Sequence, residues 1–552
     1  MISVKVAQAS GAGDPLRAMA PNLFSAHRRG VVVNGAQSLI ESLVKAGVDI
    51  CFANPGTSEM HLVQAIDATP AMRPVLCLFE GVCSGAADGY GRMRGAPATT
   101  LLHLGAGLGN AVANLHNARR AGTPVLNLVG DHAIHHVAFD APLTADIEGV
   151  AKPVSAWIRT AKTPEGLAAD GLAAVQASMA ANPNPQGGVA TLIVPADCAW
   201  GEGGDLHATP VVRELLPPSA SAVTKAAAML GPKSMLLLDG LVLASERGIQ
   251  LAGRIAAKTG AQVFSSTFPA RVESGAGRFP INKMPYFPEQ VMKTMSGFDA
   301  LVLVGAEAPV SFFAYPDTPS DLVPPGMPVQ RLAHRHEDGV AALQALADAV
   351  GAPEQPALVN PLERPAMPQG KLTTSAVAEM VAATAPEGCI VSTDSGGGGA
   401  AYPVMQRSVP HTWLNLTGGS IGQGGPVALG AALACPDRRV YALLGDGGAM
   451  YTNAFLWTAA REKLDITVVI YSNRSYNILE VEYRRLGVNS VGERAGSLFD
   501  LSGPDIDWVG LAAAQGVPGS KAATSEAFAA ALAEADKVAG PYLIEAEVTA
   551  RQ

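Results

Sequence analysis

Long apolar runs and clusters of positive charge are both missing from this 552-residue sequence. No apolar run reaches the roughly 18 residues that a membrane-spanning helix needs. The longest candidates, Ser234–Ala244 and Ala300–Val310, contain Asp239 and Glu307 and are interpreted as buried strands, with the strands themselves expected at Ser234–Leu238 and Ala300–Val304. The formal net charge is −9, and no Lys/Arg run is interleaved with aromatic residues, as nucleic-acid binding would require. The sequence therefore predicts neither a membrane nor a nucleic acid as a partner.

Cysteine is scarce as well, and the six cysteines form no CxxC pair. Their scattered spacing fits neither a disulfide scaffold nor a zinc site, and it suits a reduced, cytoplasmic setting. The first thirty residues contain Ala and Arg but no continuous apolar core. We therefore expect a flexible N-terminal arm over residues 1–30 and no secretory signal.

Aromatic and charged residues make up only 5% and 16% of the sequence, whereas 48% of the residues are hydrophobic. This composition suits parallel α/β sheets, whose central strands are covered on both faces. Apolar segments of strand length alternate with helix-length segments, which predicts right-handed βαβ crossovers. We expect an α/β fold of three doubly wound, parallel-sheet domains at residues 31–200, 215–352 and 371–552, with a Pro-rich linker at residues 353–370.

The clearest chemical signal is Gly445-Asp446-Gly447-Gly448, directly after the expected strand Val440–Leu444. Open α/β sheets bind ligands at the carboxyl ends of their strands, and glycines let backbone N–H groups approach a diphosphate. Asn473 closely follows the next expected strand, so its amide oxygen can reach the same point. Carboxylate, amide and diphosphate oxygens together suit Mg²⁺. A lone Gly-Asp-Gly is more often an ordinary turn, and the matching Asn favours the metal site.

A second candidate is Glu80, which closes the apolar strand Pro74–Phe79 and opens the small-residue helix Gly81–Arg94. A carboxylate between apolar neighbours loses solvation, which favours sharing a proton. The alternative is that Glu80 is an acid stabilising a helix N-terminus through the helix dipole. Position alone favours that second interpretation.

Together these motifs resemble those of thiamine diphosphate enzymes of the acetolactate synthase-like, benzoylformate decarboxylase and pyruvate decarboxylase family. The segments that carry the resemblance follow the family's order: Asn54–Thr57, Glu80, Ala87–Arg92 and Gly418–Ser475. The resemblance implies thiamine diphosphate and Mg²⁺ as cofactors, with Glu80 activating the pyrimidine ring. It also implies metal ligands at Asp446, at Asn473 and at the backbone carbonyl of Ser475.

The same resemblance implies further contacts with the cofactor. Ile421 would be a hydrophobic wedge between its two rings, and Gly419 would accept a hydrogen bond from its 4′-amino group. The other expected contacts lie in the diphosphate loops and beside the metal: Asp394, Ser395, Gly396, Gly397, Gly445, Asp446, Gly447, Gly448, Asn473, Tyr476 and Ile478. On their own, the Gly-rich segments would be interpreted as ordinary turns.

Four residues of the first block are candidates for substrate chemistry. His103, within Leu102–Asn110, is similar to the active-site histidine of benzoylformate decarboxylases, and an imidazole can protonate or orient a substrate oxygen. The pair His135-His136 resembles the His-His of pyruvate decarboxylases, although it could instead cap a loop. Thr57 stands where the benzoylformate enzymes have a substrate-facing Ser, so it can hydrogen-bond a carboxylate but cannot act as an acid.

The sequence departs from these relatives in the central block and beside the metal motif. Benzoylformate decarboxylases have a second catalytic histidine where this chain has Gly277–Pro288, a stretch without histidine in which Lys283 is the one plausible proton donor. Leu479 stands where pyruvate decarboxylases have a Glu, which predicts a more apolar pocket. Acetolactate synthases hold FAD in the middle domain, which leaves FAD open as a cofactor here, although no flavin motif is visible.

The resemblance implies a 2-oxo acid decarboxylase or carboligase. Loss of CO₂ would leave an enamine, which is either protonated to an aldehyde or added to an aldehyde or ketone acceptor. Because Gly277–Pro288 has no histidine to act as an acid, protonation would be slow and ligation would be favoured. By the same resemblance the cofactor lies between the first domain of one subunit and the third of another, so a homodimer or homotetramer is expected.

Two alternatives stay open at this point. The chain could be a catalytically degenerate homologue that binds thiamine diphosphate without turnover. It could also be a nicotinamide-dependent oxidoreductase, because Gly105–Asn110 resembles a dinucleotide fingerprint with Asp131 about twenty residues further on. Against this, Asn110 stands where the third glycine belongs, and the motif leaves Glu80 unexplained.

Overall fold

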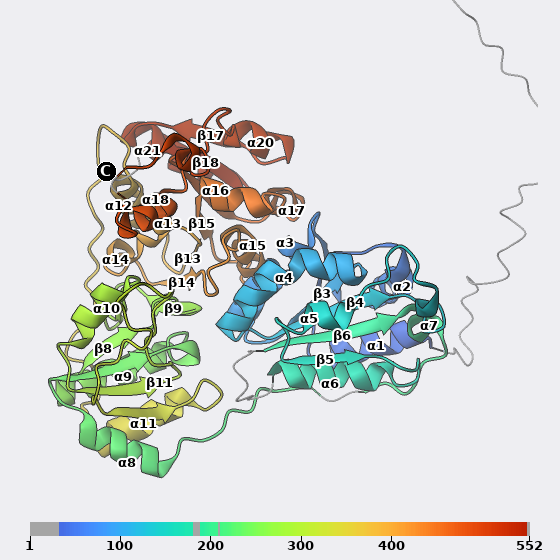
Figure 1. Ribbon diagram of the computed structural model, residues 1–552, viewed down its shortest axis with the longest axis horizontal. Coiled ribbons are helices and arrows are strands. Elements are labelled where there is room, and N and C mark those ends of the chain that lie inside the picture. Colours follow the sequence, from blue (N-terminus) through green and yellow to red (C-terminus); the bar gives the residue numbers. More distant parts are fainter. Residues whose placement is uncertain (1–32, 180–187, 208–209, 489, 549–552) are drawn as a thin grey trace, which may run out of the picture.

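The computed structural model describes residues 33–179, 188–207, 210–488 and 490–548 (Figure 1). The arm expected over residues 1–30 lies outside these ranges. The described chain forms three sheets of six, five and seven strands with helices packed around them. The prediction of an α/β fold with three parallel-dominated sheets is confirmed.

The N-terminal sheet is parallel throughout, in the order β2-β1-β3-β4-β6-β5. Its strands are β1 (Ile50–Asn54), β2 (Arg73–Leu76), β3 (Ala98–Leu102), β4 (Val125–Asp131), β5 (Trp157–Thr160) and β6 (Val189–Pro195). Its helices are α1 (Gly35–Lys45), η2 (Thr57–Glu59), α2 (Met60–Asp67), α3 (Glu80–Arg94), α4 (Leu104–Ala121), η3 (Val137–Phe139), α5 (Ile147–Ala151), α6 (Leu167–Met179) and α7 (Ala196–Trp200). The central strands β3 and β6 are buried along their whole length, as apolar runs covered on both faces must be.

The central sheet is also parallel, in the order β10-β8-β7-β11-β12. It comprises β7 (Ser234–Leu238), β8 (Gln262–Ser265), β10 (Asn282–Lys283), β11 (Ala300–Val304) and β12 (Val329–Ala333), with α8 (Ala220–Met229), η4 (Gly240–Val242), α9 (Glu246–Thr259), α10 (Pro288–Met295) and α11 (Gly339–Ala349). The strands expected at Ser234–Leu238 and Ala300–Val304 are confirmed as β7 and β11, and the rest of each apolar run lies outside them. The chain turns where polar side chains interrupt each run, and Val310 is 69% exposed.

The C-terminal sheet has the order β17-β18-β16-β15-β13-β14-β9. Its strands from the third block are β13 (Ile390–Thr393), β14 (His411–Asn415), β15 (Val440–Gly445), β16 (Ile466–Ser472), β17 (Gly519–Ala522) and β18 (Tyr542–Glu547). The helices are α12 (Thr374–Thr384), α13 (Gly396–Gly399), α14 (Tyr402–Met405), α15 (Gly424–Ala434), α16 (Asp446–Ala449), η5 (Met450–Thr452), α17 (Phe455–Arg461), α18 (Asn477–Arg485), α19 (Glu493–Gly496), α20 (Trp508–Ala514) and α21 (Ser525–Ala535).

The edge of this sheet is formed by a strand from the central part of the sequence. Strand β9 (Arg271–Ser274) pairs antiparallel with β14, so the C-terminal sheet is mixed. The buried carboxylate of Glu273 accepts hydrogen bonds from Arg271 and from Thr412 Oγ1, the latter at 3.0 Å. These polar contacts fix the register of a strand too short to show a periodic pattern.

Helices α3 and α15 bring the first and third sheets together (Figure 1). Glycines make this close approach possible. A Cβ placed on Gly89 would lie 2.1 Å from the Val427 carbonyl oxygen, and one on Gly430 would lie 1.9 Å from the Ala86 oxygen. The two helices therefore pack backbone to backbone. No helix in the described ranges is long and apolar enough to cross a membrane, and the six cysteines are all free thiols.

Candidate active site

Asp446 begins α16 directly after β15, at the carboxyl edge of the C-terminal sheet. The residue is 5% exposed. Its Oδ1 accepts a 2.8 Å hydrogen bond from the Gly447 N–H, and its Oδ2 accepts one of 2.7 Å from the Arg474 N–H. Burial raises the pKa of the Asp446 carboxyl, and the backbone donors partly oppose that rise. Each carboxylate oxygen keeps a further lone pair for a cation.

The bond from Arg474 draws the loop after β16 onto Asp446. Arg474 has a φ of 54°, in the left-handed region that non-glycine residues rarely adopt. Such strain persists where the surrounding structure over-determines it. On either side of Arg474 lie Asn473, whose Oδ1 accepts a 3.2 Å bond from the Ser475 N–H, and Ser475 itself. The structure therefore brings together the three residues expected to bind the metal.

The donors available here are hard oxygens, from one carboxylate, one side-chain amide and nearby carbonyls. Mg²⁺ prefers such ligands and shares them with phosphate groups, so these residues fit that ion. The described residues contain no group of three His, Cys, Asp or Glu side chains able to hold a metal.

Loops from three strand ends meet beside Asp446. A Cβ placed on Gly445 would lie 3.3 Å from the Ser395 Cβ. One placed on Gly448 would lie 3.5 Å from the Ile421 Cβ and 3.7 Å from Asp394 Oδ1. The glycines thus leave room for backbone N–H groups to approach a ligand, and this cradle fits a diphosphate.

Asp394, expected to contact the diphosphate, is held by backbone N–H groups of the loop before α15. Its Oδ2 accepts 3.0 Å hydrogen bonds from the N–H groups of Gly422 and Gly424. Burial raises the pKa of the Asp394 carboxyl, and its Oδ1 is buried without a partner. Asp394 therefore fixes the loop that precedes α15, and its contact with the diphosphate stays a prediction. Ser395 caps α13 by accepting a 2.9 Å bond from the Gly398 N–H.

Gly396 and Gly397 open α13, and Gly397 packs on the Tyr471 ring. Tyr476 covers the segment Gly445–Gly448, here called the metal loop, because a Cβ on Gly447 would lie 2.3 Å from its Cε1. Burial, Tyr451 and Asp446 raise the pKa of Tyr476 to about 12.

Exposed apolar residues, here called the apolar border, lie in α18 and beside Gly419. Ile478 and Leu479, in α18, are 48% and 42% exposed. Gly419 has a φ of 82°, and a Cβ there would lie 2.9 Å from the Phe312 ring. Phe312 itself is 42% exposed. An apolar substrate side chain could pack against these residues.

Glu80 is the first residue of α3 and is 7% exposed. Its Oε2 accepts a 2.9 Å hydrogen bond from Asn110 Nδ2 in α4. A Cβ placed on Gly107 would lie 3.0 Å from Glu80 Oε1 and 3.4 Å from the His103 Cβ. Gly107 therefore lies between the carboxylate and the histidine, and both side chains flank one gap at the start of α4.

His103 follows β3, and its Nδ1 lies 2.9 Å from Oε2 of the buried Glu59. Our sequence analysis missed Glu59, although it lies two residues beyond the Asn54–Thr57 motif. Thr57 is exposed at the start of η2. Leu104, directly after His103, has a φ of 49°, a second strained position beside a candidate side chain.

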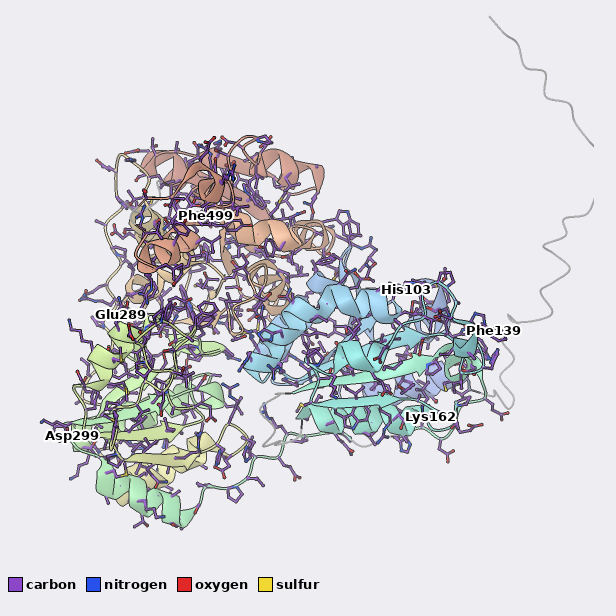
Figure 2. All side chains as sticks on the ribbon, in the orientation of Figure 1. His103, Phe139, Lys162, Glu289, Asp299 and Phe499 are labelled. Atoms are coloured by element: carbon purple, nitrogen blue, oxygen red, sulfur yellow. The ribbon has the colours of Figure 1, made fainter. Side chains whose placement is uncertain are left out.

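The histidine pair lies farther along the same carboxyl edge, after β4. His135 and His136 are exposed, and His135 Nδ1 is 3.6 Å from Asp197 Oδ2. No hydrogen bond joins either histidine to His103 within the described ranges. His103 and Phe139, three residues beyond the pair, are labelled on the N-terminal domain in Figure 2.

Two expectations from the sequence are answered by α4 and Lys283. The Gly105–Asn110 segment forms the first turns of α4, and Asn110 holds Glu80, so the nicotinamide alternative is not favoured.

Lys283 Nζ is enclosed, 3.3 Å from Asn415 Oδ1 and 5.4 Å from the Phe268 ring centre. Burial lowers the pKa of Lys283 to about 8.

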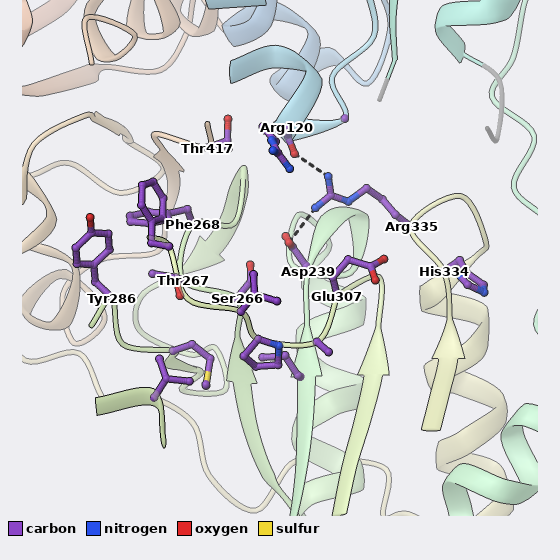
Figure 3. A pocket seen from close by; sticks show the side chains of 18 of the residues that line it. Arg120, Asp239, Ser266, Thr267, Phe268, Tyr286, Glu307, His334, Arg335 and Thr417 are labelled. Carbon is purple, nitrogen blue, oxygen red and sulfur yellow. Dashed lines mark hydrogen bonds and ion pairs between the residues drawn. The ribbon is translucent and has the colours of Figure 1, made fainter. Parts of the chain in front are cut away.

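A cavity of about 750 Å³ opens at the carboxyl edge of the central sheet, where the acetolactate synthase resemblance places FAD. Figure 3 shows Arg335 bridging it, with bonds of 3.0 Å to Asp239 Oδ2 and 2.7 Å to the Arg120 carbonyl oxygen. Arg213 also lines the cavity. Its size falls within the range of small-molecule sites, and its lining carries both signs of charge, from three arginines and from Asp239, Glu307 and Glu337.

A buried aspartate beside a glycine cradle on one sheet, and a buried glutamate on another, fit the class of thiamine diphosphate enzymes. Residues 33–150 match the family model described as thiamine pyrophosphate enzyme, N-terminal TPP binding domain. Residues 396–546 match the corresponding C-terminal TPP binding domain. The chain belongs to the thiamine pyrophosphate enzyme family, as predicted.

Curated relatives cover nearly the whole chain. It is 47% identical over 520 residues to a Mycobacterium tuberculosis protein named "Putative acetolactate synthase large subunit IlvX", covering 94% of this chain and 99% of that one. It is 28% identical to the benzoylformate decarboxylase of Pseudomonas aeruginosa, covering 92% and 97% of the two chains. Among solved structures, the thiamine diphosphate-dependent 4-hydroxybenzoylformate decarboxylase of Rhodococcus jostii RHA1 superposes with a TM-score of 0.81 at 25% identity, covering 94% and 99%.

Proposed function

We propose that this protein is a thiamine diphosphate- and Mg²⁺-dependent enzyme that decarboxylates a 2-oxo acid and then protonates or ligates the product. The observation that carries the proposal is that each of two sheets holds one half of the expected site. One half is Glu80, held by Asn110; the other is Asp446, with the Asn473 loop drawn onto it. The acetolactate synthase-like and benzoylformate decarboxylase names of its relatives support the same chemistry.

Each half-site has a separate task. Thiamine diphosphate, when bound, would supply a carbon nucleophile and an electron sink. Asp446 and Asn473 would hold Mg²⁺ and, through it, the diphosphate. Glu80 would hold a proton at the pyrimidine ring. His103, across Gly107 from Glu80, would move a proton at the substrate oxygen.

The other residues would place the substrate and exclude water. The Thr57 hydroxyl would donate to the substrate carboxylate, and Ile421 would hold the cofactor rings apart. His135 and His136 would border the substrate entrance, where they are exposed. The apolar border formed by Ile478, Leu479 and Phe312 favours an apolar substituent on the 2-oxo acid.

Ligation is the favoured outcome over simple protonation. The stretch Gly277–Pro288 has no histidine, and Lys283 is enclosed between Phe268, Tyr402 and Asn415. Without a second acid at the substrate, protonation of the decarboxylated product slows, and a second carbonyl compound has time to react. We expect ligated product to exceed aldehyde at saturating acceptor.

The working unit would contain at least two chains. Within one chain, among the described residues, no hydrogen bond joins Glu80 to the Asp446 loops. The carboxyl edge of the N-terminal sheet exposes large apolar residues, including Leu78 (50%), Ile134 (47%) and Phe139 (75%). We expect a homodimer or homotetramer by light scattering, and a Phe139→Asp variant should weaken it.

The deciding experiment is product analysis with CO₂ measurement. Purified protein with thiamine diphosphate and Mg²⁺ would be given pyruvate and benzoylformate separately, with and without an aldehyde acceptor. Release that requires both cofactors supports the proposal, and the ratio of ligated product to aldehyde decides the outcome of the reaction. Cofactor binding with no release from either acid, or from a wider set of 2-oxo acids, would favour the degenerate homologue.

A further inference from the structure

The carboxylate of Glu59 is wholly enclosed at the end of η2. The side chain is 0% exposed, whereas the His103 side chain is 24% exposed. Glu59 Oε2 accepts a 2.7 Å hydrogen bond from the Gly56 N–H and lies 2.9 Å from His103 Nδ1. Its Oε1 accepts a 2.8 Å bond from the Ser58 hydroxyl. A buried carboxylate is costly unless donors surround it, and here three donors do so.

Two glycines make room for this pair. A Cβ placed on Gly130, in β4, would lie 1.8 Å from Glu59 Oε1. A Cβ placed on Gly56 would lie 2.1 Å from His103 Nδ1. Neither glycine has a positive φ, so space and not backbone conformation demands glycine at both positions. Glycine at these two positions therefore leaves room for the contact between Glu59 and His103.

The surroundings determine which nitrogen of His103 carries the proton. An ionised carboxylate only accepts hydrogen bonds, so a neutral imidazole facing Glu59 Oε2 must present Nδ1–H and leave Nε2 unprotonated. Ser58 Oγ approaches the same nitrogen, at 3.3 Å. Because serine and glutamate share one side of the ring, the group is not a nucleophile–histidine–acid relay, and Nε2 is left for another partner.

We propose that Glu59 is a positioning residue that holds His103 in the Nδ1–H tautomer. A proton then enters and leaves at Nε2. The charged group facing His103 from the other side of Gly107 is Glu80. The destination of the proton rests on the proposed function, whereas the tautomer is a property of the folded chain alone.

Nuclear magnetic resonance of the full chain with ¹⁵N-labelled histidine tests the tautomer without turnover. His103→Asn assigns the signal by its loss. In the unmodified protein we expect a protonated Nδ1 and an unprotonated Nε2. Glu59→Gln should shift His103 to the Nε2–H form or to a mixture, because an amide can donate as well as accept. An unmodified protein in the Nε2–H form, or no change in Glu59→Gln, would overturn the proposal.

Kinetics with a 2-oxo acid then test whether Glu59 acts through His103. Glu59→Gln should lower kcat about 10-fold or more, with KM changing less. In a His103→Ala background the same change should have less than about a 2-fold further effect. Equal losses in both backgrounds would contradict the proposal. The exposed Glu165 of the same domain, changed to Gln, is the matched control.

Folding and the proposed function can be separated from this outcome. If Glu59→Gln fails to fold, Glu59→Asp keeps the charge and carries the same test: a retained Nδ1–H form supports the proposal, and an Nε2–H form contradicts it. If no 2-oxo acid is turned over, the proposed function fails while the resonance experiment still decides the role of Glu59.

Discussion

The side-chain amide of Asn110 donates a 2.9 Å hydrogen bond to Glu80 Oε2, which ties α4 to the first residue of α3. The other carboxylate oxygen lies over Gly107, where a Cβ would come within 3.0 Å of it. One oxygen of Glu80 is therefore held by the protein and the other is left beside a gap. A carboxylate prepared in this way suits proton exchange with a heteroaromatic ring.

Glu80→Gln should abolish proton exchange and leave the shape of the site intact. We expect kcat to fall about 10²–10⁴-fold, the usual contribution of a general acid or base, with cofactor affinity changed much less. CO₂ release and a fluorescence titration with thiamine diphosphate measure the two effects. Glu165→Gln, exposed on the same domain, is the control. More than half of the activity remaining in Glu80→Gln would remove Glu80 from the mechanism.

Asp446→Asn should weaken metal binding selectively. The amide keeps one oxygen but loses the negative charge that binds Mg²⁺. We expect the Kd for Mg²⁺, measured calorimetrically with thiamine diphosphate present, to rise about 10-fold or more. Asp437→Asn, exposed before β15, should leave it unchanged. Removing metal with a chelator should abolish activity in the unmodified protein, and adding Mg²⁺ should restore it.

His411 should make stability depend on pH. It is 1% exposed, its Nδ1 lies 2.8 Å from the Val409 carbonyl oxygen, and burial lowers its pKa from 6.5 to about 4. Between these values the unfolded chain binds more protons than the folded one, so stability falls as pH falls from 6.5 towards 4. The full effect is about 3 kcal/mol.

His411→Asn keeps a donor for Val409 but cannot titrate. Its loss of stability between pH 7 and pH 5, measured by urea unfolding, should be smaller than that of the unmodified protein. His207→Asn, at a half-buried position, is the control. Equal pH dependence in the two chains would show that His411 does not titrate on unfolding.

Lys283→Met should stabilise the protein. Burial lowers the pKa of Lys283 from 10.5 to about 8, so the charged form is penalised in the folded chain at pH 7. The stability of the folded chain therefore rises as pH rises from 8 to 10.5, because the unfolded chain binds more protons in that range. Methionine removes this cost, and we expect about 1 kcal/mol or more of added stability at pH 7.

Activity of the same variant separates two roles for Lys283. Because the side chain is enclosed by Phe268, Tyr402 and Asn415, we expect the ratio of aldehyde to ligated product to stay the same. A fall in aldehyde alone would instead make Lys283 a proton donor to the product. Lys293→Met, in α10, is the control.

The convergence of Asp446 and Asn473 could be predicted from the sequence because it depends on local order. Each residue lies at or just after the end of an apolar strand, and β15 and β16 pair in parallel, so their carboxyl ends meet. The family and the α/β class could be predicted in the same way. The domain boundaries and the roles of individual site residues stay predictions.

Contacts that depend on distant segments could not be predicted. The burial of Glu59 requires Gly130, from a strand 71 positions further on, to leave room for its carboxylate. Strand β9 has four residues and no alternating pattern, so nothing local distinguishes it from a loop.

The origin of β9 affects any attempt to divide the chain into pieces. Residues 271–274 complete the sheet that holds the metal loop, although they precede the Pro-rich segment 353–370. A fragment beginning at residue 371 would leave the backbone of β14 unpaired along one side, and unpaired strand edges recruit other chains. In proteolytic dissection, or in recombination with a relative, the central and C-terminal parts should therefore be kept together as one unit.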